Sequence, residues 1–169
     1  VGATGVSGVY GDDGGTPGDT TDDTGVRLTN GTLLAVVGAS GSLALNTSGT
    51  LSLLGSLPLA FEGTAVLEIN STSSRVTRSL NVGGVNRTLD VGPNLERLAL
   101  RNVLATFTDF VELSGDFSVE RTVSGSTTTL QLATSSVGAF LGVQRGQSDA
   151  FGVRVSGASA ALVIEKPSG

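Results

Sequence analysis

The alternation of apolar and polar residues constrains this chain more than any other feature. Between residues 111 and 123 the apolar residues take every second position, and polar residues fill most of the positions between them. The apolar side consists of Val111, Leu113, Phe117, Val119 and Val123, with Gly115 and Arg121 in the same register. A strand turns successive side chains to opposite faces, whereas a helix returns to one face about every 3.6 residues. The pattern therefore predicts a strand with one buried and one solvated face, as in an antiparallel sheet.

The same alternation recurs elsewhere in the chain. Residues 57–73 predict a second strand, whose apolar face consists of Leu59, Phe61, Ala65, Leu67 and Ile69. The Gly83-Gly84 pair inside RSLNVGGVNRTLDV predicts a hairpin, because glycine adopts the positive φ angles that tight turns need. Two shorter segments, TTTLQLAT and GTLSLLGS, also predict strands. Strands are thus expected along most of the chain.

One segment, residues 94–107, fits a helix as well as a strand. Asn94 is a suitable helix N-cap, and the segment is rich in helix-forming residues. It also alternates like a strand, and Val103, Thr106 and Thr108 favour that conformation. Because strands are predicted on both sides, we expect a strand here.

A near-repeat connects the two ends of the chain. GVRLTNGTLLAVV at residues 25–37 matches GVRVSGASAALVI at residues 152–164, with four of the thirteen positions identical. The triplet VGA also occurs twice, starting at Val1 and at Val137. A nine-residue insertion in an acidic loop of the first copy reconciles the two spacings. We therefore expect a repeated unit rather than chance similarity.

The repeat implies an elongated architecture. We expect one β-rich unit at residues 1–136, with an acidic loop at residues 11–23, and we expect residues 137–169 to begin the next unit or to supply a strand to a neighbouring subunit. A lone amphipathic strand gains too little from apolar burial to offset the entropy of ordering it, so it needs a second apolar layer, either from a facing sheet or from the neighbouring repeat. The predicted fold is all-β, an antiparallel β-sandwich-like repeat unit in an elongated array, with a β-solenoid as the alternative.

The composition disfavours several functional classes. Cysteine and histidine are absent, which removes the usual residues of a zinc site and of a Cys–His or Ser–His nucleophile. Without a Gly-x-Ser-x-Gly elbow or a phosphate-binding loop, we predict that the chain is not an enzyme. The net charge of -5 argues against nucleic acid as a partner, and no apolar stretch approaches the ~20 residues of a membrane-spanning helix. Because the chain begins at Val1 without a signal peptide, we expect an excerpt or processed product of a longer protein.

Four segments resemble, in this order, a repeat found in very large secreted or surface proteins of bacteria. They are GVRLTNGTLLAVV, GTLSLLGSLPLAFEGTAVLEINST, FVELSGDFSVER and VGAFLG followed by GVRVSGASAALVI, and they extend from about Gly25 to Ile164. The chain departs from the repeat pattern at residues 11–23 and at NLERLALRN. The resemblance implies an extracellular array with an adhesive or fibre-forming role, and it supplies no functional residues.

The acidic loop is the candidate metal site. GDDGGTPGDTTDD concentrates five aspartates, namely Asp12, Asp13, Asp19, Asp22 and Asp23. Flexible Asp/Gly loops suit calcium, which takes several carboxylate oxygens. The spacing is neither that of an EF-hand nor that of the calcium-binding nonapeptide repeat. Calcium is therefore the one candidate cofactor, and a solvated acidic loop is the alternative.

Two further patterns have simple explanations. Glu112, Asp116 and Glu120 lie on one face of a predicted strand about 13 Å apart, too far for a catalytic pair, so we expect them, with Asp109, to solubilise the surface. Four asparagines begin Asn-x-Ser/Thr glycosylation triplets, which a Ser/Thr-rich chain produces by chance. They are Asn30, Asn46, Asn70 and Asn86.

The predicted function is structural. We expect a unit that stacks end to end in an extracellular filament or giant surface protein, with copies of itself or adjacent repeats as partners. The predicted inter-unit contacts are Val153, Val155, Leu162 and Ile164, together with Arg27 and Arg154, which occupy equivalent repeat positions. These two arginines either pair with acidic groups at the junction or lie at the surface. The alternative function is an adhesin module whose loops, chiefly residues 11–23, bind a glycan or a surface, with calcium as an optional ligand.

Overall fold

The computed structural model describes residues 1–12, 15, 22–55, 58–108, 110–144 and 147–167. Within these residues the chain consists of strands and connecting turns, and it has no helix long and apolar enough to cross a membrane. The ten strands are β1 (Gly2–Asp12), β2 (Thr24–Val37), β3 (Leu43–Leu54), β4 (Leu59–Asn70), β5 (Val76–Val82), β6 (Val85–Val91), β7 (Leu95–Phe107), β8 (Val111–Ser124), β9 (Thr127–Val143) and β10 (Phe151–Pro167).

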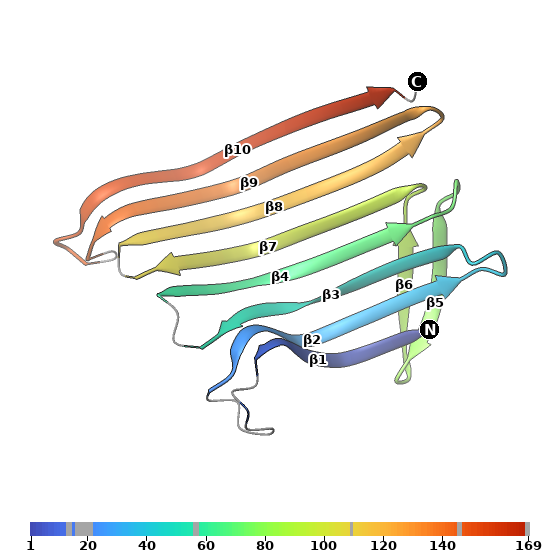
Figure 1. Ribbon diagram of the computed structural model, residues 1–169, viewed down its shortest axis with the longest axis horizontal. Coiled ribbons are helices and arrows are strands. Elements are labelled where there is room, and N and C mark those ends of the chain that lie inside the picture. Colours follow the sequence, from blue (N-terminus) through green and yellow to red (C-terminus); the bar gives the residue numbers. More distant parts are fainter. Residues whose placement is uncertain (13–14, 16–21, 56–57, 109, 145–146, 168–169) are drawn as a thin grey trace.

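Eight of the strands form one open antiparallel sheet in the order β1-β2-β3-β4-β7-β8-β9-β10. The remaining two, β5 and β6, form a hairpin that crosses one face of the sheet near β1–β4 (Figure 1). The predicted all-β, antiparallel, β-sandwich-like fold is confirmed, and among the described residues this hairpin is the second layer. The expected strand at residues 94–107 is confirmed as β7, and the Gly83-Gly84 turn joins β5 to β6 with φ angles of 58° and 84°.

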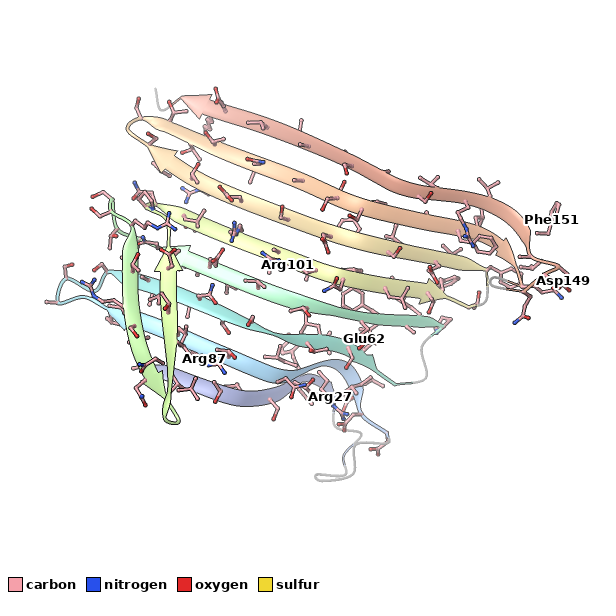
Figure 2. All side chains as sticks on the ribbon, turned by 180° about the vertical axis from the view of Figure 1, so that it is seen from behind. Arg27, Glu62, Arg87, Arg101, Asp149 and Phe151 are labelled. Carbon is pink, nitrogen blue, oxygen red and sulfur yellow. The ribbon has the colours of Figure 1, made fainter. Side chains whose placement is uncertain are left out.

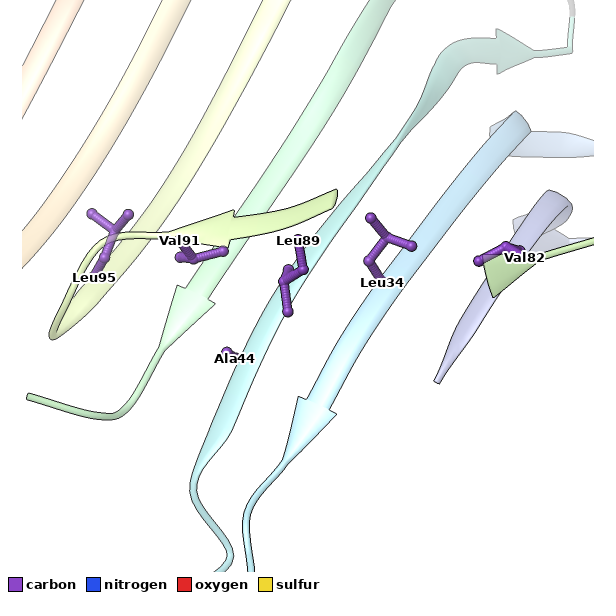
Figure 3. Packing of buried hydrophobic residues seen from close by; sticks show 6 residues of the cluster. All are labelled: Leu34, Ala44, Val82, Leu89, Val91 and Leu95. Carbon is purple, nitrogen blue, oxygen red and sulfur yellow. The ribbon is translucent and has the colours of Figure 1, made fainter. Parts of the chain in front are cut away.

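The buried core lies where the hairpin meets the sheet (Figure 3). Leu89 and Val91 of the hairpin pack on side chains from β2, β3 and the start of β7. The cluster consists of Leu34, Ala44, Val82, Leu89, Val91 and Leu95, with Val36, Val76 and Leu80 packed against it. We call the side of the sheet that carries this cluster the hairpin face, and the opposite side the open face.

The open face is the more apolar side of the sheet. Residues directly opposite each other in neighbouring strands share a face, so the register defines rows that cross the sheet. One row on the open face consists of Ala3, Leu33, Thr47, Leu67, Leu98, Val119, Leu132 and Leu162. Among the described residues, no second layer covers this row.

This arrangement bears on the expected burial of β8. The alternation between residues 111 and 123 is present, but the apolar side faces away from the hairpin. Leu113 and Val119 are 38% and 44% exposed, whereas Glu112 on the other face is only 7% exposed. Within the described chain no facing sheet covers this apolar face, because the hairpin covers a different part of the sheet and on the opposite side. Of the two expected sources of a covering layer, the neighbouring unit stays a prediction.

A band of β-bulges crosses the middle of the sheet. The register shifts in six of the seven strand pairs of the sheet, all except β3–β4. The extra residues adopt positive φ angles at Asn30 in β2 and Asn102 in β7, for example. Bulges bend strands and increase their twist. Aligned bulges therefore curve the sheet as a unit rather than strand by strand.

Asn70 connects the hairpin to the sheet. It ends β4, is 1% exposed, and points toward the hairpin. Its side-chain amide donates to the carbonyl oxygens of Ser74 and Gly92 at 2.8 Å each, and its Oδ1 accepts from the backbone N–H of Thr72 at 2.9 Å. The segment entering the hairpin and the segment leaving it are thus held by one side chain.

An exposed ion pair fastens the open end of the hairpin. Arg75, just before β5, donates from Nε and Nη2 to the two carboxylate oxygens of Asp90 in β6, at 2.7 and 2.6 Å. The Thr77 hydroxyl donates to the same carboxylate at 2.9 Å. The hydrogen bond from Arg75, followed by that from Thr77, lowers the pKa of Asp90 to about 2 from an ordinary value of 3.8.

This ion pair predicts a pH dependence of hairpin stability. Because the pKa of Asp90 is lower in the folded chain, the pair stabilises the fold above the ordinary value of 3.8, and this contribution is lost as the pH falls toward about 2. We expect the urea midpoint of the wild-type chain to fall more steeply over this window than that of Asp90→Asn. Asp149→Asn, a change at an exposed loop aspartate, should retain the wild-type slope. Equal slopes in all three chains would contradict the prediction.

Candidate assembly surfaces

The sheet ends in two edge strands, β1 and β10. Each pairs with one neighbouring strand within the described chain, β1 with β2 and β10 with β9. β10 is 17 residues long, and residues 151–166 are all exposed. The two edges lie on opposite sides of the sheet (Figure 1). Both strands therefore present a row of outward backbone N–H and C=O groups to solvent.

The β10 edge has few of the features that usually protect an edge strand. Natural edges carry charges, prolines or short strands, which prevent pairing with another chain. The ten residues from 155 to 164, VSGASAALVI, contain neither a charge nor a proline. Charged side chains occur only toward the strand ends, at Arg154, Glu165 and Lys166. The centre of β10 is accordingly suited to accept another strand.

The hairpins at the two edges share a glycine pair. Gly11 lies opposite Gly25 in β1–β2, and Gly142 lies opposite Gly152 in β9–β10. A Cβ on Gly25 would lie 2.7 Å from the Cα of Gly11, and a Cβ on Gly152 would lie 2.7 Å from the Cα of Gly142. Each pair allows a backbone approach that any side chain would obstruct. The sequence match of residues 25–37 with 152–164 thus extends to three-dimensional structure.

The hairpins also share their bulges. Five residues after the second glycine of each pair, the chain adopts a positive φ, 53° at Asn30 and 69° at Gly157. On the partner strands, six residues before the first glycine, Gly5 and Ser136 have φ angles of 69° and 54°. Four backbone positions, two with a glycine and two with a positive φ angle, are therefore equivalent in β1–β2 and β9–β10.

The register corrects the expected upstream alignment. The backbone N–H of Ala35 donates to the carbonyl oxygen of Val1, whereas Val137 lies opposite Ala158, the counterpart of Gly31. Val137 therefore occupies the place of Val6, not that of Val1, and the VGA triplets are not equivalent. Gly11 and Gly25 are 14 positions apart, and Gly142 and Gly152 are 10 apart, so the loops differ by four residues rather than nine.

The expected unit boundary falls inside a strand. Residues 136 and 137 are both part of β9, which belongs to the same sheet as β1–β4. Residues 137–169 thus contribute the second half of β9 and all of β10. The assignment of this segment to a following unit or neighbouring subunit stays a prediction.

The six predicted contact residues divide between the two faces. Val153, Val155, Leu162 and Ile164 all lie on the open face of β10, between 49% and 68% exposed. Arg27 lies on the hairpin face together with Glu62 and Arg101 (Figure 2). Arg154 lies on this same face, where its guanidinium is 5.8 Å from the ring centre of Phe140 in β9. The apolar members of the predicted set therefore lie on one face of the sheet and the basic members on the other, and their role as inter-unit contacts stays a prediction.

Apolar side chains of β7–β10 enclose a depression on the open face. It has a volume of about 400 Å³ and is lined chiefly by Leu98, Leu100, Phe117, Leu132 and Leu162. A contiguous exposed apolar surface of this kind is typical of an interaction site in a chain of this size. It extends the apolar side of β10 inward across the sheet.

Polar residues on the hairpin face form a cross-strand row that sequence reasoning missed. Asn46 Nδ2 donates to Glu68 Oε1 at 2.9 Å, and Arg97 forms an ion pair with Glu68 and approaches Glu120 at 3.9 Å. These residues lie on β3, β4, β7 and β8, far apart in the chain. Only the register brings them together, so no spacing in the sequence could have indicated the row. Its charges are paired across the sheet, Arg97 with Glu68 and with Glu120, which is consistent with a structural role.

The predicted solubilising carboxylates have different surroundings. Glu112 is buried, Asp116 accepts a hydrogen bond from the Asn102 backbone N–H at 2.8 Å, and Glu120 belongs to the polar row. Asp109 lies outside the described residues. The described members are therefore built into the sheet, and Asp116 in particular supports the bulge at Asn102.

The acidic loop is only partly described. Asp12 and Asp22 are exposed and Asp23 is buried, while Asp13 and Asp19 lie outside the described residues. Within the part of the chain that the structure describes, no three acidic side chains gather into a group that could hold a metal ion. Calcium binding by the loop stays a prediction.

Comparison with known proteins adds no relative. Neither the protein-family models, nor the curated proteins, nor the solved structures contain a match to this chain. The class is therefore defined by the fold alone: over the residues that the structure describes, the chain is all-β, with one open antiparallel sheet, two unpaired edges and one hairpin as a partial second layer.

Proposed function

We propose that the chain is a structural unit of an extended β-sheet assembly and that units join through strand contacts at their edges. The single observation behind this proposal is the β10 edge, which is long, exposed and uncharged over its central ten residues. A strand with these properties normally pairs with another strand. The partners are copies of the chain or adjacent units of the same kind.

The open face supports the same proposal. Its apolar row crosses all eight strands of the sheet, and a single unit leaves it in contact with water. Apolar area removed from water stabilises a protein by roughly 25 cal/mol per Å². An isolated unit lacks this stabilisation on the open face of its sheet. In an assembly, neighbouring units can cover the open face.

The composition is consistent with an extracellular or cell-surface location. The chain has no cysteine and one lysine, and its sequence is rich in Gly, Ser, Thr and Val. The resemblance of four of its segments to repeats of giant bacterial surface proteins favours the same location. We propose, accordingly, that the assembly is a filament or the repeat array of a large surface protein.

Deleting residues 152–169 is expected to weaken assembly more than it weakens the fold. This deletion removes β10, while the buried cluster between the hairpin and β2, β3 and β7 stays intact. We expect sedimentation velocity and electron microscopy to show multimers or filaments for the full chain and mostly single units for the shortened one. Urea unfolding of the two chains should give similar midpoints. Unchanged multimers after the deletion would refute assembly through this edge.

The adhesin alternative predicts a different result in the same experiment. A module that binds a glycan through residues 11–23 would remain as discrete monomers with or without β10. Its binding to a glycan array would be lost on Asp→Asn changes at Asp12 and Asp22. Filaments together with an empty glycan array would exclude it.

A further inference from the structure

We infer that the outer edge of β10 binds, antiparallel, the β3 strand of a second copy of this chain, so that β9–β10 of one copy replaces β1–β2 of the next. This inference rests on the proposed assembly and names the strand, its direction and its register. It follows from the structural equivalence of the two edge hairpins.

The equivalence places β10 in the role of β2. The two strands share their sequence pattern, the glycine at Gly25 or Gly152, and the bulge at Asn30 or Gly157. Each pairs on one side with an equivalent strand, β1 for β2 and β9 for β10. On its other side β2 pairs with β3. The corresponding side of β10 is its free edge.

The outward peptide groups of β10 are oriented like the peptide groups of β2 that face β3. In β2 the N–H of Ala35 donates to Val1 of β1, so the next residue, Val36, directs its peptide groups toward β3. Val163 holds the place of Val36. An independent route gives the same orientation. The backbone N–H of Val123 in β8 donates to the carbonyl oxygen of Asn94, on the side of β7. Successive residues of a strand direct their peptide groups to opposite sides, and the register carries this alternation from β8 through β9 to β10. The peptide groups of Ile164 therefore face β9, and those of Val163 face outward.

The register of β2–β3 transfers directly to β10. In the chain, Leu28 lies opposite Leu51, Ala35 opposite Leu45 and Val37 opposite Leu43. An incoming β3 strand would therefore place these three leucines opposite positions 155, 162 and 164. These positions hold Val155, Leu162 and Ile164.

Both faces of the added strand match their new surroundings. The leucines of β3 would join the apolar residues of β10 on the open face and would extend the apolar row by one strand. On the hairpin face, Ser52 and Thr50 would lie opposite Arg154 and Ser156, which are polar as well. Because a one-residue slip would reverse both faces, the register is well determined.

The test uses disulfide trapping. Because the chain contains no cysteine, only the introduced thiols can form a disulfide. The probe is a peptide of residues 43–54 with flanking lysines for solubility and with Leu45→Cys, and the protein is the full chain with Leu162→Cys. The two are mixed under oxidising conditions, and mass spectrometry quantifies the cross-linked product. We expect about tenfold more product than with the same peptide that carries Thr47→Cys instead of Leu45→Cys. Thr47 lies on the same face but two residues out of register. Similar cross-linking of both peptides, or of neither, would overturn the inference.

A second pair of variants tests the outward backbone groups. Val163→Pro removes an outward N–H and should reduce cross-linking of the Leu45→Cys peptide by about tenfold. Val163→Thr keeps the N–H and the branched shape, and should cross-link like the parent. Equal loss in both variants would show that the side chain, and not the edge, binds the peptide, and would contradict the inference.

Mixing full-length chains separates this inference from the proposed function. Chains with Leu162→Cys and chains with Leu45→Cys, unfolded and refolded together, should give a disulfide-linked dimer that the Thr47→Cys chain does not give. Multimers without this register preference would overturn the inference and leave assembly standing. A wild-type chain that stays monomeric while the peptide cross-links in register would refute self-assembly and support the edge site.

Discussion

Replacing Leu89 with alanine is expected to lower the free energy of unfolding by about 2–5 kcal/mol. Leu89 is 0% exposed and lies at the centre of the one buried hydrophobic cluster found among the described residues. The change removes apolar contacts with β2 and β3 and leaves a cavity beneath the hairpin. Urea unfolding followed by circular dichroism measures the effect.

Leu98→Ala is the matched control. It makes the same chemical change on the open face, where the side chain is 47% exposed. We expect a loss below about 1 kcal/mol, since much of the leucine already contacts water. An equal loss of unfolding free energy at Leu98 and at Leu89 would mean that the open face is covered in solution. It would contradict the assignment of the main core to the hairpin face.

Replacing Asn70 with alanine is expected to cost about 2–4 kcal/mol, although no apolar contact of similar size is lost. The side chain satisfies backbone groups at both ends of the hairpin. Its removal leaves the Val91 carbonyl, whose hydrogen bond is buried, and the half-buried Gly92 carbonyl and Thr72 N–H without this partner. Buried polar groups that lose a hydrogen bond bear the full cost of desolvation. Hydrogen exchange should show faster opening of β5 and β6 than of β8 and β9.

Asn86→Ala controls for the loss of an asparagine from the same region. Asn86 is exposed near the hairpin turn, where its Oδ1 accepts from Asn81 at 3.2 Å. We expect a change within about 0.5 kcal/mol. An equal effect of the two substitutions would contradict the role assigned to Asn70. The burial of Asn70 also bears on glycosylation, because its amide nitrogen is occupied in the folded chain, whereas Asn30 and Asn86 are exposed.

The free edges and the open face have a common physical cause. The sheet has eight strands, and the two-stranded hairpin covers only one corner of one face. Within the described residues, backbone groups at the edges and apolar side chains on the open face are therefore both exposed to solvent. An assembly that adds strands at the β10 edge would continue the open face from one unit to the next.

Several features could be predicted from the sequence because they depend on neighbouring residues. Alternation is a local property, and it identified β4, β8 and also β7, where helix propensity competed. The glycine pair at Gly83-Gly84 marked its hairpin because few other residues adopt those backbone angles. The match of residues 25–37 with 152–164 indicated a repeated pattern, and in the structure β2 and β10 share the positions of a glycine and of a bulge.

What covers each face was decided only by the tertiary structure. Alternation shows that the two faces of β8 differ, but it carries no information on which face meets a second layer within the chain. Leu113 and Val119 lie on the face opposite the hairpin and are 38% and 44% exposed. The position of the hairpin, the polar row through Glu68 and Arg97, and the free edge of β10 all depend on strand order. Strand order results from contacts between residues far apart in the chain, and no local pattern encodes it.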